Sequence, residues 1–324
     1  ALQHLMKHNL YQRSKEDKML KYYWTLIYGA IEPSPFEAFK KKFGPLIRDA
    51  NLVADERQEL ISQFSKYSTG FVKFAEAFTE IEARSHSYNV WGTSSAENES
   101  RQLASLLHKK QDNMGYPDLM LAVVIASYIR FNHNEFTKVL SAIEKSVFRV
   151  YHIVNKQSQH GYSRIGKLAA NIYSNSKTSD EVVEWIKNFT VDEGTLEDIK
   201  SELENRINSY KWAGIIYFLH EYERHLGGGV CINFDEFPNT KQSIEHILPQ
   251  SPNTNGYWDE NFNFEEKTKL THSLGNLCLT QDNSFYYNHD YPRKREGLQL
   301  IEGCIIYLML SKNLMSLLVC LSEM

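Results

Sequence analysis

One stretch decides how the chain is interpreted: Ile244-Glu245-His246-Ile247-Leu248-Pro249-Gln250-Ser251. Its apolar residues predict a short buried strand over residues 243–248. Pro249 ends this strand because proline has no backbone N–H to donate to a sheet. The strand carries a carboxylate, Glu245, directly beside an imidazole, His246. The stretch therefore gives a structural signal and a chemical one at the same place.

A second apolar segment follows downstream, Ser273-Leu274-Gly275-Asn276-Leu277-Cys278-Leu279-Thr280. It predicts another strand, residues 274–279, that carries Asn276. The polar residues between the strands predict a loop excursion, and Asn283 is expected to begin a final helix after the second strand. The order strand, excursion, strand, helix predicts a small ββα unit.

Carboxylate, imidazole and carboxamide groups in this order are typical of a hydrolytic site around a hard cation. Hydrolysis of a phosphodiester needs a nucleophilic water, a base and a positive charge at the phosphate. His246 is the predicted base, since imidazole accepts protons near neutral pH. Glu245 and Asn283 are the predicted ligands of a single divalent cation, Mg²⁺ or Mn²⁺, because they offer oxygen donors. Since side chains alternate along a strand, Glu245 and His246 reach one cation only at a bulge or turn.

Other residues near this pattern are expected to support it. Asn276 lies inside an apolar strand, and a buried amide must be hydrogen-bonded. We therefore expect it to clamp the segment around His246 and count it with His246 as a catalytic residue. The predicted nucleic-acid contacts are His272, Arg293, Lys294 and Arg295. For each of these four, the alternative interpretation is a solvated surface residue.

The chain before about residue 226 shows helical periodicity almost throughout. Helices are expected at about 18–31, 35–49, 55–84, 100–112, 119–131, 135–155, 163–175, 179–189, 195–208 and 209–225. We expect Asn134, Asp180 and Thr195 to lie at the starts of three of them, where polar side chains cap free N–H groups.

The predicted architecture is mainly α. A large helical domain over residues 1–226 is followed by a ββα-metal module over residues 230–300. Gly227-Gly228-Gly229 is the expected hinge between them, because glycine is favoured after a helix end. Residues 301–324 are expected to form a C-terminal helix that packs on the body. Polar residues interrupt this apolar tail, which favours a buried helix over a membrane span.

Composition limits the function classes. The chain has 324 residues and a net charge of −4, so it is not uniformly basic and needs only a local basic surface to bind nucleic acid. Its four cysteines are far apart and predict neither a zinc site nor a disulfide framework, which favours reduced thiols and a cytoplasmic location. The chain opens without an initiator Met inside a helical pattern, so we expect it to begin within a longer protein.

The linked blocks 244–251, 274–279 and 282–284 resemble the HNH, or His-Me finger, nucleases. More narrowly they resemble the C-terminal HNH domain of the GmrSD-type, modification-dependent (type IV) restriction enzymes of bacterial phage defence. The resemblance covers about residues 240–296. It implies a metal-dependent DNA endonuclease with His246 as general base, Glu245 and Asn283 as metal ligands and Asn276 in support.

The same resemblance implies phage or modified DNA as the partner. Family members usually carry an N-terminal nucleotide-hydrolysing domain with an Asp-Gly-Gln-Gln-Arg-like motif, and we expect that domain to be missing from this chain. The apolar tail after Gly297 departs from the family, whose relatives tend to end in a polar, basic helix. Two alternatives stay open: a helical scaffold or DNA-binding protein with an inactive HNH module, and an RNA-cleaving nuclease with the same site.

Overall fold

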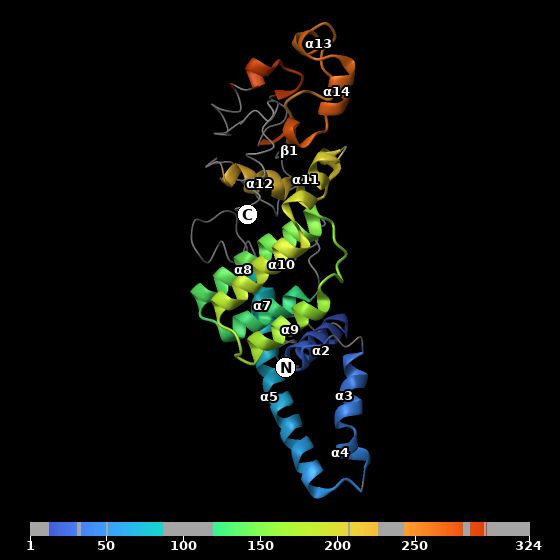
Figure 1. The fold of residues 1–324 in the computed structure, drawn as a ribbon, viewed down its shortest axis with the longest axis vertical. Coiled ribbons are helices and arrows are strands. Elements are labelled where there is room, and N and C mark those ends of the chain that lie inside the picture. The colour runs from blue at the N-terminus through green and yellow to red at the C-terminus, as the bar shows by residue number, and fades with distance from the viewer. Residues whose placement is uncertain are drawn as a thin grey trace.

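A computed structural model describes residues 13–30, 34–49, 51–86, 119–206, 208–225, 243–280, 286–294 and 296. These residues form an elongated, mainly helical molecule, with the two strands and their neighbours toward one end and α4 and α5 at the other (Figure 1). The predicted mainly α class is confirmed. In these ranges no helix is long and apolar enough to cross a membrane.

The described helical part follows the predicted order closely, and the helix predicted at 100–112 lies outside the described residues. Its elements are α2 (Arg13–Tyr28), α3 (Pro35–Phe43), α4 (Pro45–Arg48), α5 (Ala54–His86), α7 (Met120–Arg130), α8 (His133–Val147), the π-helical turn η1 (Phe148–Ile153), α9 (Tyr162–Tyr173), α10 (Ser179–Glu193), α11 (Leu196–Glu204), the 3-10 turn η2 (Ser209–Lys211) and α12 (Ile215–His225). The α5 segment is one continuous helix, and the segment expected as helix 209–225 begins with the η2 turn instead.

Capping residues confirm one predicted helix start and move two others. Thr195 caps α11 as predicted, in a reciprocal capping box. The α8 helix is capped by Asn132 instead of Asn134, and α10 by Thr178 instead of Asp180. In both cases the capping residue lies three positions before a glutamate, which returns a hydrogen bond to the cap's own N–H. The reciprocal bond explains why the earlier residue starts the helix.

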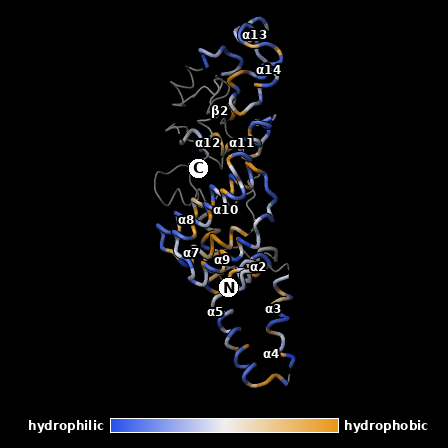
Figure 2. The backbone as a smooth tube through the Cα atoms, in the orientation of Figure 1, coloured by the Kyte–Doolittle hydropathy of each residue, from blue (hydrophilic) through white to orange (hydrophobic). Residues whose placement is uncertain are grey.

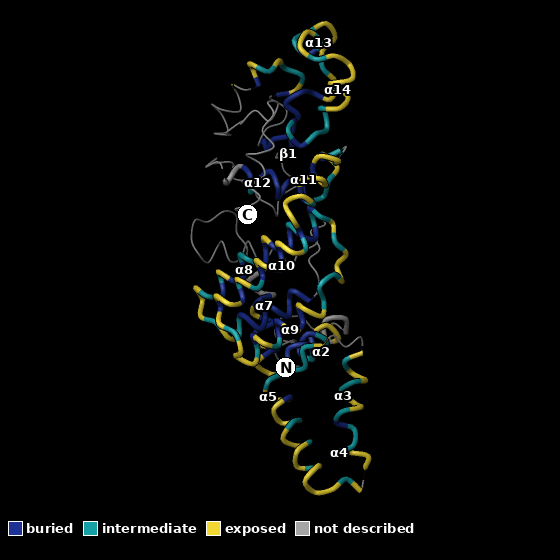
Figure 3. The backbone as a smooth tube through the Cα atoms, in the orientation of Figure 1, coloured by how far each residue is buried: buried dark blue, intermediate teal, exposed yellow. Residues whose placement is uncertain are grey.

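The first hydrophobic core lies around α7, whose residues from Met120 to Ser127 are all buried. Helices α2, α5, α8, α9 and α10 pack around it, and the hydrophobic and buried colours concentrate there (Figures 2 and 3). Tyr23 of α2 lies inside this core, and its ring centroid is 4.7 Å from that of Tyr67. Its hydroxyl donates to the backbone oxygen of Tyr67 at 2.8 Å.

A second hydrophobic core joins the end of the helical part to the strands. It contains Phe148 and Ile153 of η1, together with residues of α11 and α12. Residues of both strands and the indole of Trp258 belong to the same core. The indole N–H of Trp258 donates to the backbone oxygen of His289 at 3.1 Å. This core crosses residue 226, the boundary expected from the sequence, so α11 and α12 form the platform of the strand pair.

The two strands are β1 (Ser243–His246) and β2 (Leu277–Thr280), which pair antiparallel with Glu245 opposite Cys278 and His246 opposite Leu277. Between them lie α13 (Tyr257–Asn261), α14 (Phe264–Leu270) and the 3-10 turn η3 (Leu274–Asn276). The second strand therefore begins later than predicted, because residues 274–276 wind into that turn.

The strand pair is as expected, but the ββα unit as a whole is not confirmed. After β2 the structure describes residues 286–294 and 296, of which 286, 291–294 and 296 are helical. Asn283, Arg295, the hinge glycines 227–229 and the predicted C-terminal helix 301–324 lie outside the described residues.

Candidate functional site

His246 is the last residue of β1, and its imidazole is held at both ring nitrogens. Nε2 lies 3.1 Å from Nδ1 of His272, and Nδ1 lies 3.2 Å from the side-chain nitrogen of Gln250. A neutral imidazole has one donor and one acceptor nitrogen, so His246 donates in one of these contacts and accepts in the other. The residue is only 5% exposed, and its partners fix the orientation of the ring.

The surroundings of His246 keep its imidazole neutral. Burial, and to a smaller extent the neighbouring His272 and Lys294, together lower the pKa of His246 from 6.5 to about 4. Removal from water disfavours the charged imidazolium, and a nearby ammonium repels it. At pH 7 the ring therefore carries a lone pair that can accept a proton, which a general base requires.

His272 and His246 both contact Tyr210, a residue of the η2 turn. The ring centroid of Tyr210 lies 4.7 Å from that of His246 and 5.9 Å from that of His272. The backbone N–H of Ser209 also donates to the backbone oxygen of His272 at 2.9 Å. The helical part thus supplies one wall of the site. The sequence carried no signal for Tyr210, since it falls in a stretch expected to be plain helix.

Asn276 is fully buried and hydrogen-bonded, as expected. Its Oδ1 accepts from the N–H of Leu248 at 2.6 Å, and its Nδ2 donates to the backbone oxygens of Leu248 and Thr271 at 2.9 and 2.8 Å. Its own backbone oxygen accepts from the N–H of Ile247 at 2.9 Å. Asn276 therefore extends the strand pair past His246 and holds the residues that follow it.

Glu245 and Lys294 form a buried ion pair beneath the strand. Lys294 is 1% exposed, and its Nζ donates to Oε1 of Glu245 at 2.5 Å and to the backbone oxygen of His246 at 2.7 Å. Burial lowers the pKa of Lys294, while the carboxylate of Glu245 acts in the opposite direction. The structure thus places Lys294 in the interior instead of on a phosphate-contacting surface. The missed signal was Glu245 itself, because a carboxylate on a buried strand needs a cation.

The described residues do not by themselves fit a metal site. The carboxylate of Glu245 is already bound to an ammonium, which would repel a divalent cation at the same oxygens. Across the described part of the chain, no three or more His, Cys, Asp or Glu side chains are grouped so that they could hold a metal ion. The metal-ligand roles of Glu245 and Asn283 stay predictions, with Asn283 outside the described residues.

The other predicted nucleic-acid contacts differ in how exposed their side chains are. Arg293 is exposed and His272 is half-buried, so both side chains lie where a nucleic acid can approach. Arg295 lies outside the described residues. The structure therefore brings His246, His272, Asn276 and Glu245 together, and it leaves Arg293 at the surface as a predicted phosphate contact.

Residues 193–311 match the family model described as GmrSD restriction endonucleases, C-terminal domain. The matched range includes α11, η2, α12, both strands and Lys294, so it takes in the site and the second core except for the η1 residues Phe148 and Ile153. No curated protein is similar enough to the chain to match it. The match supports, for this range, the C-terminal part of a GmrSD-like restriction endonuclease.

Proposed function

From this match and from the geometry around His246, we propose that the chain is a DNA endonuclease of a bacterial anti-phage restriction system. It hydrolyses phosphodiester bonds, with His246 as the general base. One observation carries the proposal: a buried, neutral imidazole is fixed at the end of β1, inside a range that matches the restriction-endonuclease family. A catalytic base needs this protonation state and this fixed orientation.

The chain's own residues have distinct parts in the proposed reaction. His246 takes the proton of the attacking water while the oxygen of that water bonds to phosphorus. The bond from phosphorus to the leaving sugar oxygen breaks, and that oxygen takes a proton from solvent. Asn276 positions His246 through the backbone that follows it, and His272 orients the imidazole through the 3.1 Å contact. Arg293 and His272 are the proposed phosphate contacts. The proposal includes one divalent cation, Mg²⁺ or Mn²⁺, because the reaction needs positive charge at the phosphate.

Replacement of His246 by alanine tests the base. We expect plasmid cleavage in Mg²⁺ or Mn²⁺ to fall by about 10²-fold or more, the usual contribution of a positioned base. The matched control is His289→Ala, a half-buried histidine of the same module, which we expect to cut like wild type. Undiminished cutting by the His246→Ala variant would remove this assignment. Parallel digestion of DNA and RNA separates the proposed substrate from an RNA substrate.

A second candidate, a DNA-binding module without nuclease activity, is favoured by the ion pair of Glu245 with Lys294. That pair occupies the carboxylate predicted to bind the cation. Binding of DNA by the wild-type chain, with no cleavage in any divalent cation, would support this candidate. Cleavage that depends on His246 would exclude it.

A further inference from the structure

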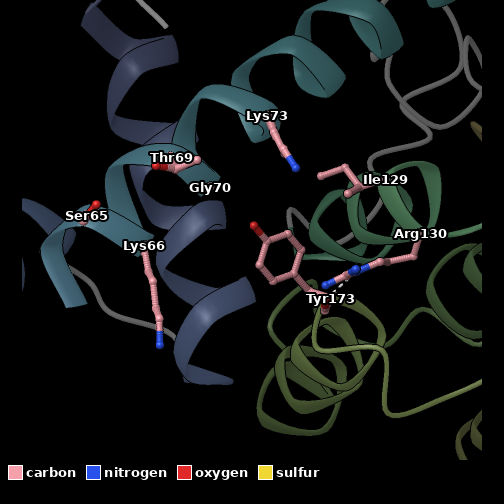
Figure 4. Close-up of a pocket in the computed structure, with 8 residues that line it drawn as sticks. All are labelled: Ser65, Lys66, Thr69, Gly70, Lys73, Ile129, Arg130 and Tyr173. Atoms are coloured by element: carbon pink, nitrogen blue, oxygen red, sulfur yellow. Dashed lines mark hydrogen bonds between the residues drawn. The ribbon is translucent and has the colours of Figure 1, made fainter. Parts of the chain in front are cut away.

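A basic groove lies on the helical body, in the part of the chain that precedes the family match. It is an open pocket of about 480 Å³ between α5 and the neighbouring helices α7 and α9 (Figure 4). Its cationic residues are Lys66 and Lys73 of α5 and Arg130 at the end of α7, and Tyr173 of α9 lies beside them. Lys73 and Arg130 approach the same space from different helices (Figure 4).

The described residues that line this basic groove carry only one sign of charge. Three of them are cationic, several bear hydroxyl groups and none is acidic. An adjoining pocket shares Arg130 and Tyr173 and adds Lys167, and its described lining again contains no acidic residue. The chain as a whole has 40 acidic and 36 basic residues, so four cations without a carboxylate are a local excess. None of the four forms an ion pair with another described residue.

Arg130 is held in place before any ligand binds. Its Nε donates to the backbone oxygen of Tyr173 at 2.5 Å, and its guanidinium lies 5.3 Å from the centroid of the Tyr173 ring. These contacts use one of its five N–H donors, and no other hydrogen bond joins it to a described residue. The remaining donors form a fork that suits phosphate oxygens, and the fixed side chain loses little freedom on binding.

The wall formed by α5 packs closely against its neighbours. At Gly70, a Cβ atom would lie 2.2 Å from the hydroxyl oxygen of Tyr23 and 2.9 Å from that of Tyr173, so only glycine allows this close approach. Lys66 and Lys73 stand on one face of the helix, two turns or roughly 10 Å apart along its axis. The basic groove therefore presents lysines spaced along one face of α5, which packs closely against Tyr23 and Tyr173 at Gly70.

We propose that the basic groove binds the phosphodiester backbone of nucleic acid at a site separate from His246. Lysine, arginine and hydroxyl side chains without base-reading geometry are typical of contacts to phosphate. On a chain of net negative charge, a local cluster of cations restricts such binding to one surface. The choice of nucleic acid over a free phosphate compound rests on the proposed function.

The test compares two variants of the full chain that lose the same charge. Lys66→Gln/Lys73→Gln removes cations from the groove, and Lys138→Gln/Lys187→Gln removes exposed lysines of α8 and α10. Binding of a fluorescent DNA duplex is measured by anisotropy in EDTA over a series of salt concentrations. Each phosphate contact contributes about 0.9 to the slope of log Kd against log salt concentration. We expect the groove variant to lower this slope by about two and the control to leave it unchanged. Equal slopes in both variants would overturn the proposal.

Two further measurements separate the sources of the phosphate. Calorimetry with inorganic phosphate and with tripolyphosphate shows whether the groove prefers a free anion. Tight binding of tripolyphosphate that depends on Lys66 and Lys73, with unchanged duplex binding, would overturn the assignment to nucleic acid. Cleavage by the His246→Ala variant is scored separately. If Lys66→Gln/Lys73→Gln lowers the salt slope and His246→Ala still cuts fully, the proposed base is wrong and the groove is kept. If the salt slope does not change and His246→Ala loses cleavage, the groove is wrong and the proposed base is kept.

Discussion

Replacing Asn276 by alanine should release the segment that follows His246. The fully buried amide makes three hydrogen bonds to the main chain, two with Leu248 and one with Thr271. They tie the residues after β1 to the turn before β2. Since alanine offers neither a donor nor an acceptor at this place, the variant leaves one N–H and two carbonyl groups without that partner.

The expected loss follows from the desolvation of these groups. A buried polar group left without a partner costs about 1–3 kcal/mol. The carbonyl oxygens have second lone pairs, and water can enter the space that the amide leaves, so each of the three groups falls near the lower limit. We expect the free energy of unfolding to decrease by about 3 kcal/mol. At 1.4 kcal/mol for each factor of ten, the module opens more than 100-fold more often.

Urea denaturation and hydrogen exchange measure this loss globally and locally. The N–H of Leu248 donates to Asn276, so we expect its exchange to accelerate in the Asn276→Ala variant. The control is Asn261→Ala, which removes an exposed amide with one hydrogen bond, 2.7 Å to the backbone oxygen of Tyr257. Its effect should stay within about 0.5 kcal/mol. A loss below about 1 kcal/mol for Asn276→Ala, with Leu248 still protected, would refute the reasoning.

Three other predictions follow from the same structure. Lys294→Met removes the buried ammonium that contacts the carboxylate of Glu245, so we expect a loss of about 3–5 kcal/mol in urea denaturation, much of it recovered when Glu245→Gln is added. Burial lowers the pKa of His152 from 6.5 to about 4. The folded state therefore binds fewer protons at His152 than the unfolded state, and the contribution of this histidine to stability falls by up to about 3 kcal/mol between pH 6.5 and pH 4. His152→Gln should remove that part of the pH dependence in acid denaturation. Removal of divalent cations with EDTA should abolish plasmid cleavage, and added Mg²⁺ or Mn²⁺ should restore it; full cleavage in EDTA would contradict the proposed cation.

Local signals in the sequence predict the helical part well. Apolar residues at three- and four-residue spacing depend only on which face of a helix is buried, so the helices predicted at 119–131 and 163–175 lie close to the observed α7 and α9. The helix predicted at 135–155 is divided between α8 and the π-helical turn η1. The predicted helix starts are wrong where a single polar residue next to the helix was chosen over a pair of residues that form a capping box. Asn132 and Thr178 start their helices because a glutamate three residues later bonds back to them. The spacing of three residues between the cap and the glutamate is visible in the sequence. It predicts Asn132 and Thr178 as the caps, in place of Asn134 and Asp180.

The candidate site was predicted in part, for a related reason. Asn276 was expected to be a buried clamp because an amide in an apolar strand has few other options. Lys294 was expected at the surface because it lies between two arginines, a pattern typical of a solvated face. Its side chain instead reaches Glu245 across 49 residues of sequence. Such a pairing depends on how the chain folds back, and spacing along the chain contains no information about it.

The ion pair of Glu245 with Lys294 allows an experiment to distinguish two possible roles of Glu245. If Glu245 is a cation ligand, Lys294 competes with the cation for the same oxygens, and Lys294→Met should lower the Mg²⁺ concentration that gives half-maximal cleavage. If Glu245 serves only to anchor Lys294 beneath the strand, the same variant loses stability but keeps that Mg²⁺ concentration. The contact of Lys294 with the backbone oxygen of His246 is lost in both cases, at 2.7 Å in the wild-type structure. A comparison of the Mg²⁺ titration with the stability loss therefore separates the electrostatic effect on the cation from the structural effect on the base.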